Sequence, residues 1–232
     1  MKKIFSIIIF FISVLGINVS ADDSLWRLVG GNWLVSSESH LLYDIVKKAE
    51  NTGLSEINDN NTVIAMNSVK GITSIQTELE IYDPSGANSS FIFLSPGSFR
   101  TFLGVRFSGE TKISKLEIIR SEIKDSTLAS SIRNNYTVTV IRDAAVEIEY
   151  GKKIPIEIKI DKKKIALFID NRKLMEYEAD RDLSTGYLGY AHKNNLIRVY
   201  SSRILSGKDV VFEDTFVKDR IKRYTVQAKK VE

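Results

Sequence analysis

The chain has 232 residues, of which 33 are lysine or arginine and 29 are aspartate or glutamate. These charges are interspersed rather than gathered in blocks, which disfavours a nucleic-acid partner. The absence of cysteine excludes disulfides, thiolate metal sites and the lipid-modified cysteine of a bacterial lipoprotein.

The first residues are typical of a secretory signal peptide. Lys2 and Lys3 precede an apolar run from Ile4 to about Ile17, and residues 19–21, Val-Ser-Ala, form a small-residue cleavage site. The apolar run is shorter than the roughly 18 to 20 residues that a membrane-spanning helix needs, and no second run of that kind follows. We therefore expect residues 1–21 to be cleaved, leaving a periplasmic or secreted protein without a transmembrane segment.

Beyond the leader, apolar and polar residues alternate in many short runs. In chain order, the expected strands begin near residues 33, 41, 62, 74, 91, 101, 136, 154, 164 and 196. Turn sequences such as Asp83-Pro84-Ser85-Gly86 separate them. Helical periodicity is weak, with a turn or two of helix expected at most in residues 121–134. The pattern predicts an all-β fold, a single antiparallel sandwich over residues 22–206.

One predicted hairpin shows this pattern at the level of single residues. Ile165, Leu167 and Ile169 point to one side of a strand, and Leu174 falls within a second short strand. Asp170-Asn171 lies between the two strands, and both residue types accept a positive φ at modest cost. We expect a tight turn at this dipeptide, with both strands covering the same core.

The segment from Gly151 to Leu205 resembles the C-terminal third of concanavalin-like jelly rolls. This superfamily includes laminin-G-like modules and sandwich domains of secreted bacterial sugar-active proteins. The matching positions are Ile158–Asp161, Phe168–Asn171, Leu174, Thr185–Gly189 and Val199–Ile204, and the stretches at 30–42 and 78–93 resemble earlier strands of the same fold. The resemblance implies a jelly-roll β-sandwich, followed by a short basic C-terminal extension at residues 207–232.

The stretch TELEIYD, residues 77–83, resembles the E-x-D-x-x-E carboxylate signature of laminarinase-type glucanases. Retaining enzymes of that type need two carboxylates about 5 to 5.5 Å apart. Here Asp83 is one methylene shorter than the required glutamate and precedes Pro84, while Glu80 replaces the central aspartate. Glu78 and Glu80 are also explained as polar residues on a solvated strand face, so we expect no catalysis.

Glycan binding is the second function considered from the sequence. Sugars bind to aromatic side chains in a groove, because flat rings cover their apolar faces. The candidate ligand-binding residues are Glu80, Tyr82, Phe102, Arg106 and Tyr190, which would line one concave face together, although packing explains each aromatic residue equally well. His40 and His192 have no acidic neighbours at ligand spacing, so we expect no metal or other cofactor.

The last residues, 217–232, carry six lysines and arginines against Asp219 and Glu232. Apolar residues alternate with these charges, which makes the segment too apolar for a purely solvated end. Since arginine and tyrosine often dominate interfaces, we expect partner contacts at Arg220, Lys222, Arg223 and Tyr224. The predicted core strands end near residue 205, so this tail would not be needed for folding.

Three functions therefore remain open. The first hypothesis is a noncatalytic structural or interaction protein of the bacterial envelope, such as a subunit of the sheath or coat of an appendage like the periplasmic flagellum. Protein partners in an envelope assembly follow from it. The alternatives are a lectin-like carbohydrate-binding module and a glycoside hydrolase of laminarinase-like fold.

Overall fold

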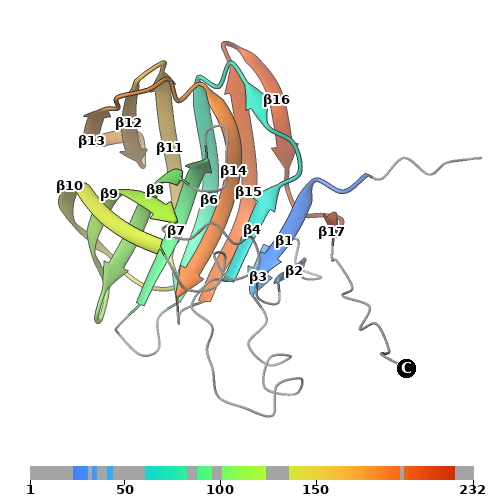
Figure 1. Cartoon of the computed structure of the whole chain (residues 1–232). Helices are drawn as coiled ribbons and strands as arrows, with labels where there is room; N and C mark the ends of the chain where they lie inside the picture. Colours follow the sequence, from blue (N-terminus) through green and yellow to red (C-terminus); the bar gives the residue numbers. More distant parts are fainter. Residues whose placement is uncertain are drawn as a thin grey trace, which may run out of the picture.

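The computed structural model describes residues 23–30, 33–35, 41–43, 61–82, 88–95, 101–123, 136–193 and 196–222. Throughout this part the regular structure consists of strands, arranged as two sheets (Figure 1). The predicted antiparallel jelly-roll β-sandwich is confirmed. Within the same residues there is no helix long and apolar enough to cross a membrane.

The first sheet has nine strands in the order β10-β9-β8-β7-β14-β4-β1-β17, with β5 beside β14. Among the described residues, the pairs within it are antiparallel except for the parallel pair β1–β17. The strands are β1 (Trp26–Gly30), β4 (Asn61–Ala65), β5 (Val69–Lys70), β7 (Asn88–Ser95), β8 (Thr101–Gly109), β9 (Ile113–Ile123), β10 (Tyr136–Ile148), β14 (Thr185–Lys193) and β17 (Ile221–Lys222).

The second sheet has eight strands in the order β13-β12-β11-β6-β15-β3-β2, with β16 beside β15. Its described pairs are antiparallel. The strands are β2 (Trp33–Val35), β3 (Leu41–Tyr43), β6 (Ser74–Tyr82), β11 (Lys153–Asp161), β12 (Lys164–Ile169), β13 (Arg172–Glu178), β15 (Leu196–Ser206) and β16 (Asp209–Asp214).

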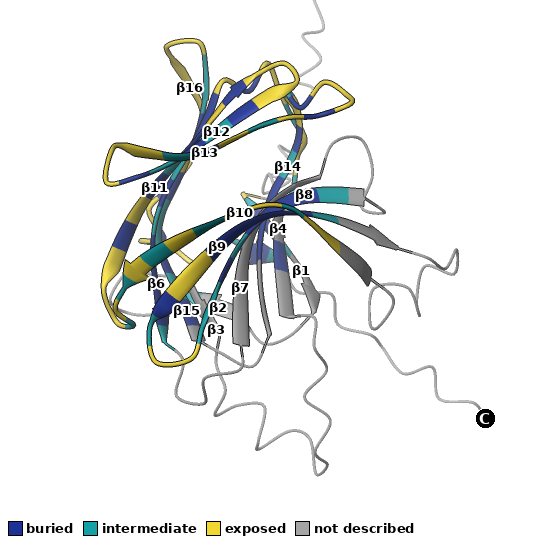
Figure 2. Cartoon of the chain, turned by 90° about the vertical axis from the view of Figure 1, so that its left-hand side faces the viewer, coloured by how far each residue is buried: buried dark blue, intermediate teal, exposed yellow. Residues whose placement is uncertain are grey.

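The core lies between the two sheets and is built by alternation. Along β11, the isoleucines at 154, 156, 158 and 160 are buried, whereas the residues between them are exposed or half-buried (Figure 2). Successive strand residues point to opposite faces, so one face of β11 meets the core and the other meets water. Each buried isoleucine contributes about 1.5–3 kcal/mol relative to an exposed one.

The predicted hairpin at the β12–β13 connection is confirmed. Asp170 has φ of 49° and Asn171 has φ of 61°, and Ile169 pairs directly with Arg172. Both turn residues therefore adopt the left-handed conformation that Asn and Asp tolerate better than most side chains.

Each of the ten predicted strand positions contains a strand. Between residues 110 and 150, however, the sequence pattern predicts a single strand, near residue 136, and the described residues there form two. Strand β9 occupies part of this segment, and β10 extends six residues past Arg142, where the alternating run ends. Ser121 belongs to β9, so the expected helical turn does not begin there; residues 124–135 lie outside the described residues.

The sheets continue beyond residue 206, where the sequence placed the start of an extension. Strand β16 pairs with β15, and β17 pairs with β1. Phe216 is fully buried and Ile221 nearly so. The expectation that the core strands end near residue 205 is therefore wrong. The resemblance to jelly rolls stops there, but buried apolar residues continue to Ile221.

Trp26 joins the first strand of the sandwich to its last strands. Its indole Nε1 donates a buried hydrogen bond of 2.8 Å to Oδ2 of Asp214. The ring centroids of Tyr190, Phe212 and Phe216 lie 5.7, 5.4 and 5.8 Å from that of Trp26. Aromatic pairs at these spacings stabilise beyond their buried area.

The Asp214→Asn variant should lower the free energy of unfolding by about 1–3 kcal/mol, because an amide nitrogen facing the indole N–H leaves a buried donor unsatisfied. Urea unfolding of the mature protein measures this loss. Asp209→Asn, an exposed change in the same strand, is the control and should be close to neutral. Equal stability of the two variants would contradict the structural role of Asp214.

A chain that ends at Phe216 should be less stable than a chain that ends at Lys222. The carbonyl of Arg220 accepts hydrogen bonds from the amides of Leu25 and Trp26, and Ile221 is buried. Removing these contacts should cost about 1.5–3 kcal/mol from the isoleucine alone, measured by urea unfolding. Identical unfolding curves would show that β17 is dispensable.

Candidate functional site

The structure divides the five predicted ligand-binding residues among three places. Glu80 and Tyr82 lie on the outer face of β6, in the eight-stranded sheet, and Phe102 and Arg106 lie on the outer face of β8, in the nine-stranded sheet. Tyr190 lies between the sheets. These residues do not share one face.

Tyr190 is a core residue, so its prediction as a ligand-binding residue is wrong. Its side chain is fully buried, and its hydroxyl is hydrogen-bonded to Thr77 at 2.9 Å and to Ser202 at 2.6 Å. Burial raises the pKa of Tyr190 to about 12. Its role is to satisfy polar groups inside the sandwich.

The outer face of the nine-stranded sheet is shielded from water around β8 and β9. Glu117 and Ile119 are 3% and 0% exposed, although they alternate with Leu116 and Ile118, which belong to the core cluster. Gly104, paired with Ile119, is buried as well. Residues that point away from the core are thus kept from solvent here.

The outer face of the other sheet likewise combines buried and exposed side chains, since Ser74 and Glu80 are 6% and 5% exposed. The side chains of Lys153, Lys159 and Arg203 are 55%, 55% and 46% exposed. Exposure therefore does not separate the two faces, and the choice of the face at β8 and β9 rests on the charged and aromatic residues gathered there.

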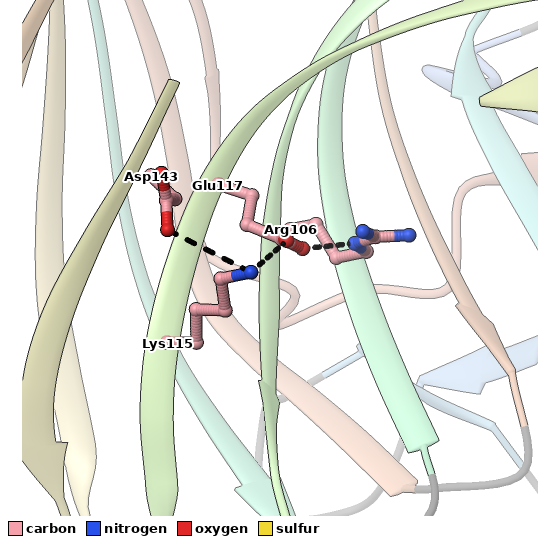
Figure 3. Close-up of polar contacts among 4 residues, drawn as sticks. All are labelled: Arg106, Lys115, Glu117 and Asp143. Carbon is pink, nitrogen blue, oxygen red and sulfur yellow. Dashed lines mark hydrogen bonds and ion pairs between the residues drawn. The ribbon is translucent and has the colours of Figure 1, made fainter. Parts of the chain in front are cut away.

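Four charged residues form a row on this shielded face (Figure 3). We call Arg106, Lys115, Glu117 and Asp143 the Arg106 cluster. The sheet register places Arg106 of β8 beside Glu117 of β9, and Glu117 beside Asp143 of β10. Arg106 Nε lies 2.5 Å from Glu117 Oε2, and Lys115 Nζ lies 2.9 Å from Glu117 Oε1 and 3.7 Å from Asp143 Oδ2.

Glu117 is held ionised by its two cationic partners. Burial raises the pKa of this carboxyl, but the hydrogen bonds from Arg106 and Lys115 outweigh burial, and the net pKa lies below its ordinary value of 4.5. The same hydrogen bond raises the pKa of Lys115. At neutral pH, Glu117 therefore accepts hydrogen bonds and does not donate a proton.

An apolar strip runs beside the Arg106 cluster. Phe102 is half-buried and lies on the same face of β8 as Gly104 and Arg106, because Leu103 and Val105 point into the core. Ile119 lies opposite Gly104 on the neighbouring strand. Gly104 and Ile119 are buried, so the ring of Phe102 is the accessible apolar surface beside the charged groups.

A second polar cluster lies on the opposite side of the molecule. Tyr200 donates a hydrogen bond from its hydroxyl to Glu80 Oε2, and Arg198 Nη1 lies 3.7 Å from the same oxygen. Arg198 also donates a hydrogen bond of 2.8 Å to the Tyr82 hydroxyl. Lys153 lies 3.3 Å from Glu78. The glutamates of the TELEIYD stretch are therefore both paired, on the outer face of the eight-stranded sheet.

This pairing lends no support to the glucanase hypothesis. Both described carboxylates of the signature are bound to neighbouring groups, and the third, Asp83, lies outside the described residues. Within the described residues there is also no group of three side chains that could hold a metal ion.

Two of the four predicted partner-binding residues can be placed. Lys222 belongs to β17 and pairs in register with Arg27, and Arg220 directly precedes that strand. Arg223 and Tyr224 lie outside the described residues. The first two are thus part of the sheet and its entry, instead of a separate tail.

The sequence did not identify Lys115, Glu117 or Asp143 as site residues. A signal was present, because Lys115 and Glu117 alternate with Leu116 and Ile118 in a strand pattern. These residues lie next to Arg106 only because of the register in which β8, β9 and β10 pair. The sequence of a single strand does not reveal that register.

Comparison with known proteins gives relatives in structure only. No model of a protein family matches the chain, and no curated protein matches its sequence. A carbohydrate-binding module, CBM66 from Bacillus subtilis, is 13% identical with a TM-score of 0.55, over 76% of this chain and 92% of that one.

Two enzymes are similar to a comparable degree. The Crh5 transglycosylase in its apo form is 11% identical, with a TM-score of 0.53 over 81% of this chain and 83% of that one. A glycoside hydrolase of family 16 from a mixed-linkage glucan locus of Bacteroides ovatus is 8% identical, with a TM-score of 0.51 over 80% and 96%. At these identities the likeness shows the fold, and it confirms the concanavalin-like jelly roll.

The Glu117→Gln variant should lower the free energy of unfolding at neutral pH by about 1–3 kcal/mol, since two cations lose a charged acceptor. Because the pKa of folded Glu117 lies below its ordinary value of 4.5, this stabilisation is complete above that pH. It is lost as the pH falls through the folded pKa. The difference in urea unfolding between wild type and variant should therefore shrink in acid.

The exposed Arg203–Glu213 pair provides the control for this measurement. Glu213→Gln changes an ion pair whose side chains are 46% and 44% exposed, and it should alter stability little. A Glu117→Gln effect no larger than this control, or one independent of pH, would contradict the account of the Arg106 cluster.

Proposed function

We propose that the mature protein is a noncatalytic, extracytoplasmic carbohydrate-binding sandwich that holds a glycan on the outer face of β8 and β9. The observation that carries this proposal is the half-buried ring of Phe102 on the same face of β8 as Arg106 and its ion-pair cluster. Sugar rings present apolar C–H faces and polar hydroxyls side by side, so a site for them needs both kinds of surface.

The charged side of the site suits hydroxyl recognition. Arg106 and Lys115 can donate hydrogen bonds to hydroxyls, and Glu117, which is 3% exposed, holds both of them in place. All three are tied together by ion pairs, which fixes their positions before a ligand arrives and lowers the entropy lost on binding.

The comparisons favour this function over the envelope-structural one. A carbohydrate-binding module has the same fold over most of its length, whereas the three similar structures reported above include no sheath or coat protein. The fold alone does not fix the function, so the proposal rests on the site. The predicted signal peptide supports a location outside the cytoplasm.

The noncatalytic part of the proposal follows from the state of Glu117. Glycosidases commonly need one carboxyl with a raised pKa as the acid, and a second carboxyl as nucleophile or base. The pKa of Glu117 is lowered instead, and the nearby Asp143 shares Lys115 with it. This pair is suited to binding and poorly suited to proton donation.

The proposal is tested by screening the mature protein on a glycan array and measuring the affinity for the retained glycan by calorimetry. Phe102→Ala should weaken binding about threefold to tenfold through the lost ring contact. Arg203→Gln, on the opposite face, is the matched control and should bind like wild type.

Two outcomes would overturn the proposal. The first is that no glycan is retained by folded wild-type protein, or that Phe102→Ala and Arg203→Gln weaken binding equally. The second concerns catalysis, for which release of reducing ends from β-glucans by the wild type would show that the protein is an enzyme.

A further inference from the structure

We infer that the glycan is acidic, with the guanidinium of Arg106 pairing with a carboxylate on the sugar. This inference rests on the proposed function and adds the class of ligand. It comes from how Arg106 is held, which leaves one edge of its guanidinium group available.

Arg106 uses only its inner nitrogen within the described part of the chain. Nε binds Glu117, and neither Nη group makes a hydrogen bond or ion pair there. Figure 3 shows the guanidinium of Arg106 extending from Glu117 to the side opposite Lys115. Four N–H donors are thus presented in a planar group.

The presented group is held in place rather than mobile. The side chains of Arg106 and Glu117 are 24% and 4% exposed, and Lys115 fixes the other oxygen of Glu117. An arginine fixed in this way has already lost most of its side-chain freedom, so a ligand gains affinity without ordering it.

The chemistry of the free edge selects a carboxylate. Two parallel N–H groups match the two oxygens of a carboxylate, a charge-assisted arrangement stronger than hydrogen bonds to neutral hydroxyls. The two cations and two anions of the Arg106 cluster cancel, so the preference for a carboxylate comes from the paired N–H donors of Arg106 and not from a net positive charge.

The test compares galacturonate oligosaccharides with galactose oligosaccharides of equal length and linkage, which differ in carrying a carboxylate instead of a hydroxymethyl group. Wild-type protein should bind the acidic series about tenfold more tightly by calorimetry. That preference should fall as sodium chloride rises from about 0.05 to 0.5 M, whereas binding of the neutral series should change little.

Arg106→Lys keeps the charge and removes the planar pair of donors. It should abolish most of the acidic preference, measured as the ratio of the affinities for the two series, because a lysine ammonium does not pair with both carboxylate oxygens at once; Arg203→Gln should leave that ratio unchanged. Should Arg106→Lys fail to fold, Lys115→Gln removes the other cation of the cluster and tests the same preference. The comparison of the two oligosaccharide series on wild-type protein tests the acidic ligand without any variant.

The outcomes separate this inference from the proposed function. Equal affinity for the two series, or preference for the neutral one, overturns the acidic ligand and leaves a carbohydrate-binding protein. Binding of neither series, together with an empty glycan array, overturns both.

Discussion

The hydrogen bond from Trp26 to Asp214 is the interaction on which the closure of the sandwich depends. It is buried and joins residues 188 positions apart. An indole N–H without an acceptor would be costly inside the core, so this bond allows Trp26 to lie among Tyr190, Phe212 and Phe216. With Trp26 in place, β1 completes one sheet and the segment after β16 covers the open end of the core.

The sequence predicted those parts of the fold in which alternation is regular. In β6 and β11 each inward position is apolar or a small polar residue, so the period of two is plain. The chain after residue 206 was not recognised, because its buried residues, such as Phe216 and Ile221, are single and lie outside long strands. Burial of isolated residues is set by tertiary packing, which a local pattern does not contain.

The candidate site shows the same limit in another form. Glu80 and Tyr82 attracted attention because they lie in a motif-like stretch, yet their strand faces away from the shielded surface. Glu117 looked like any polar residue in a strand, and it acquires its meaning only from Arg106 and Lys115 on either side of it. Chemistry that depends on cross-strand neighbours becomes visible only when the register is known.

The parallel pairing of β1 with β17 also has a consequence for biogenesis (Figure 1). Strand β1 finds this edge partner only after residues 221–222, nearly 200 positions later, have been made. Such distant contacts make closure slow relative to local hairpins. Until those residues are available, Trp26 lacks part of its cover, and a chain cut short before them would present this tryptophan to proteases and chaperones.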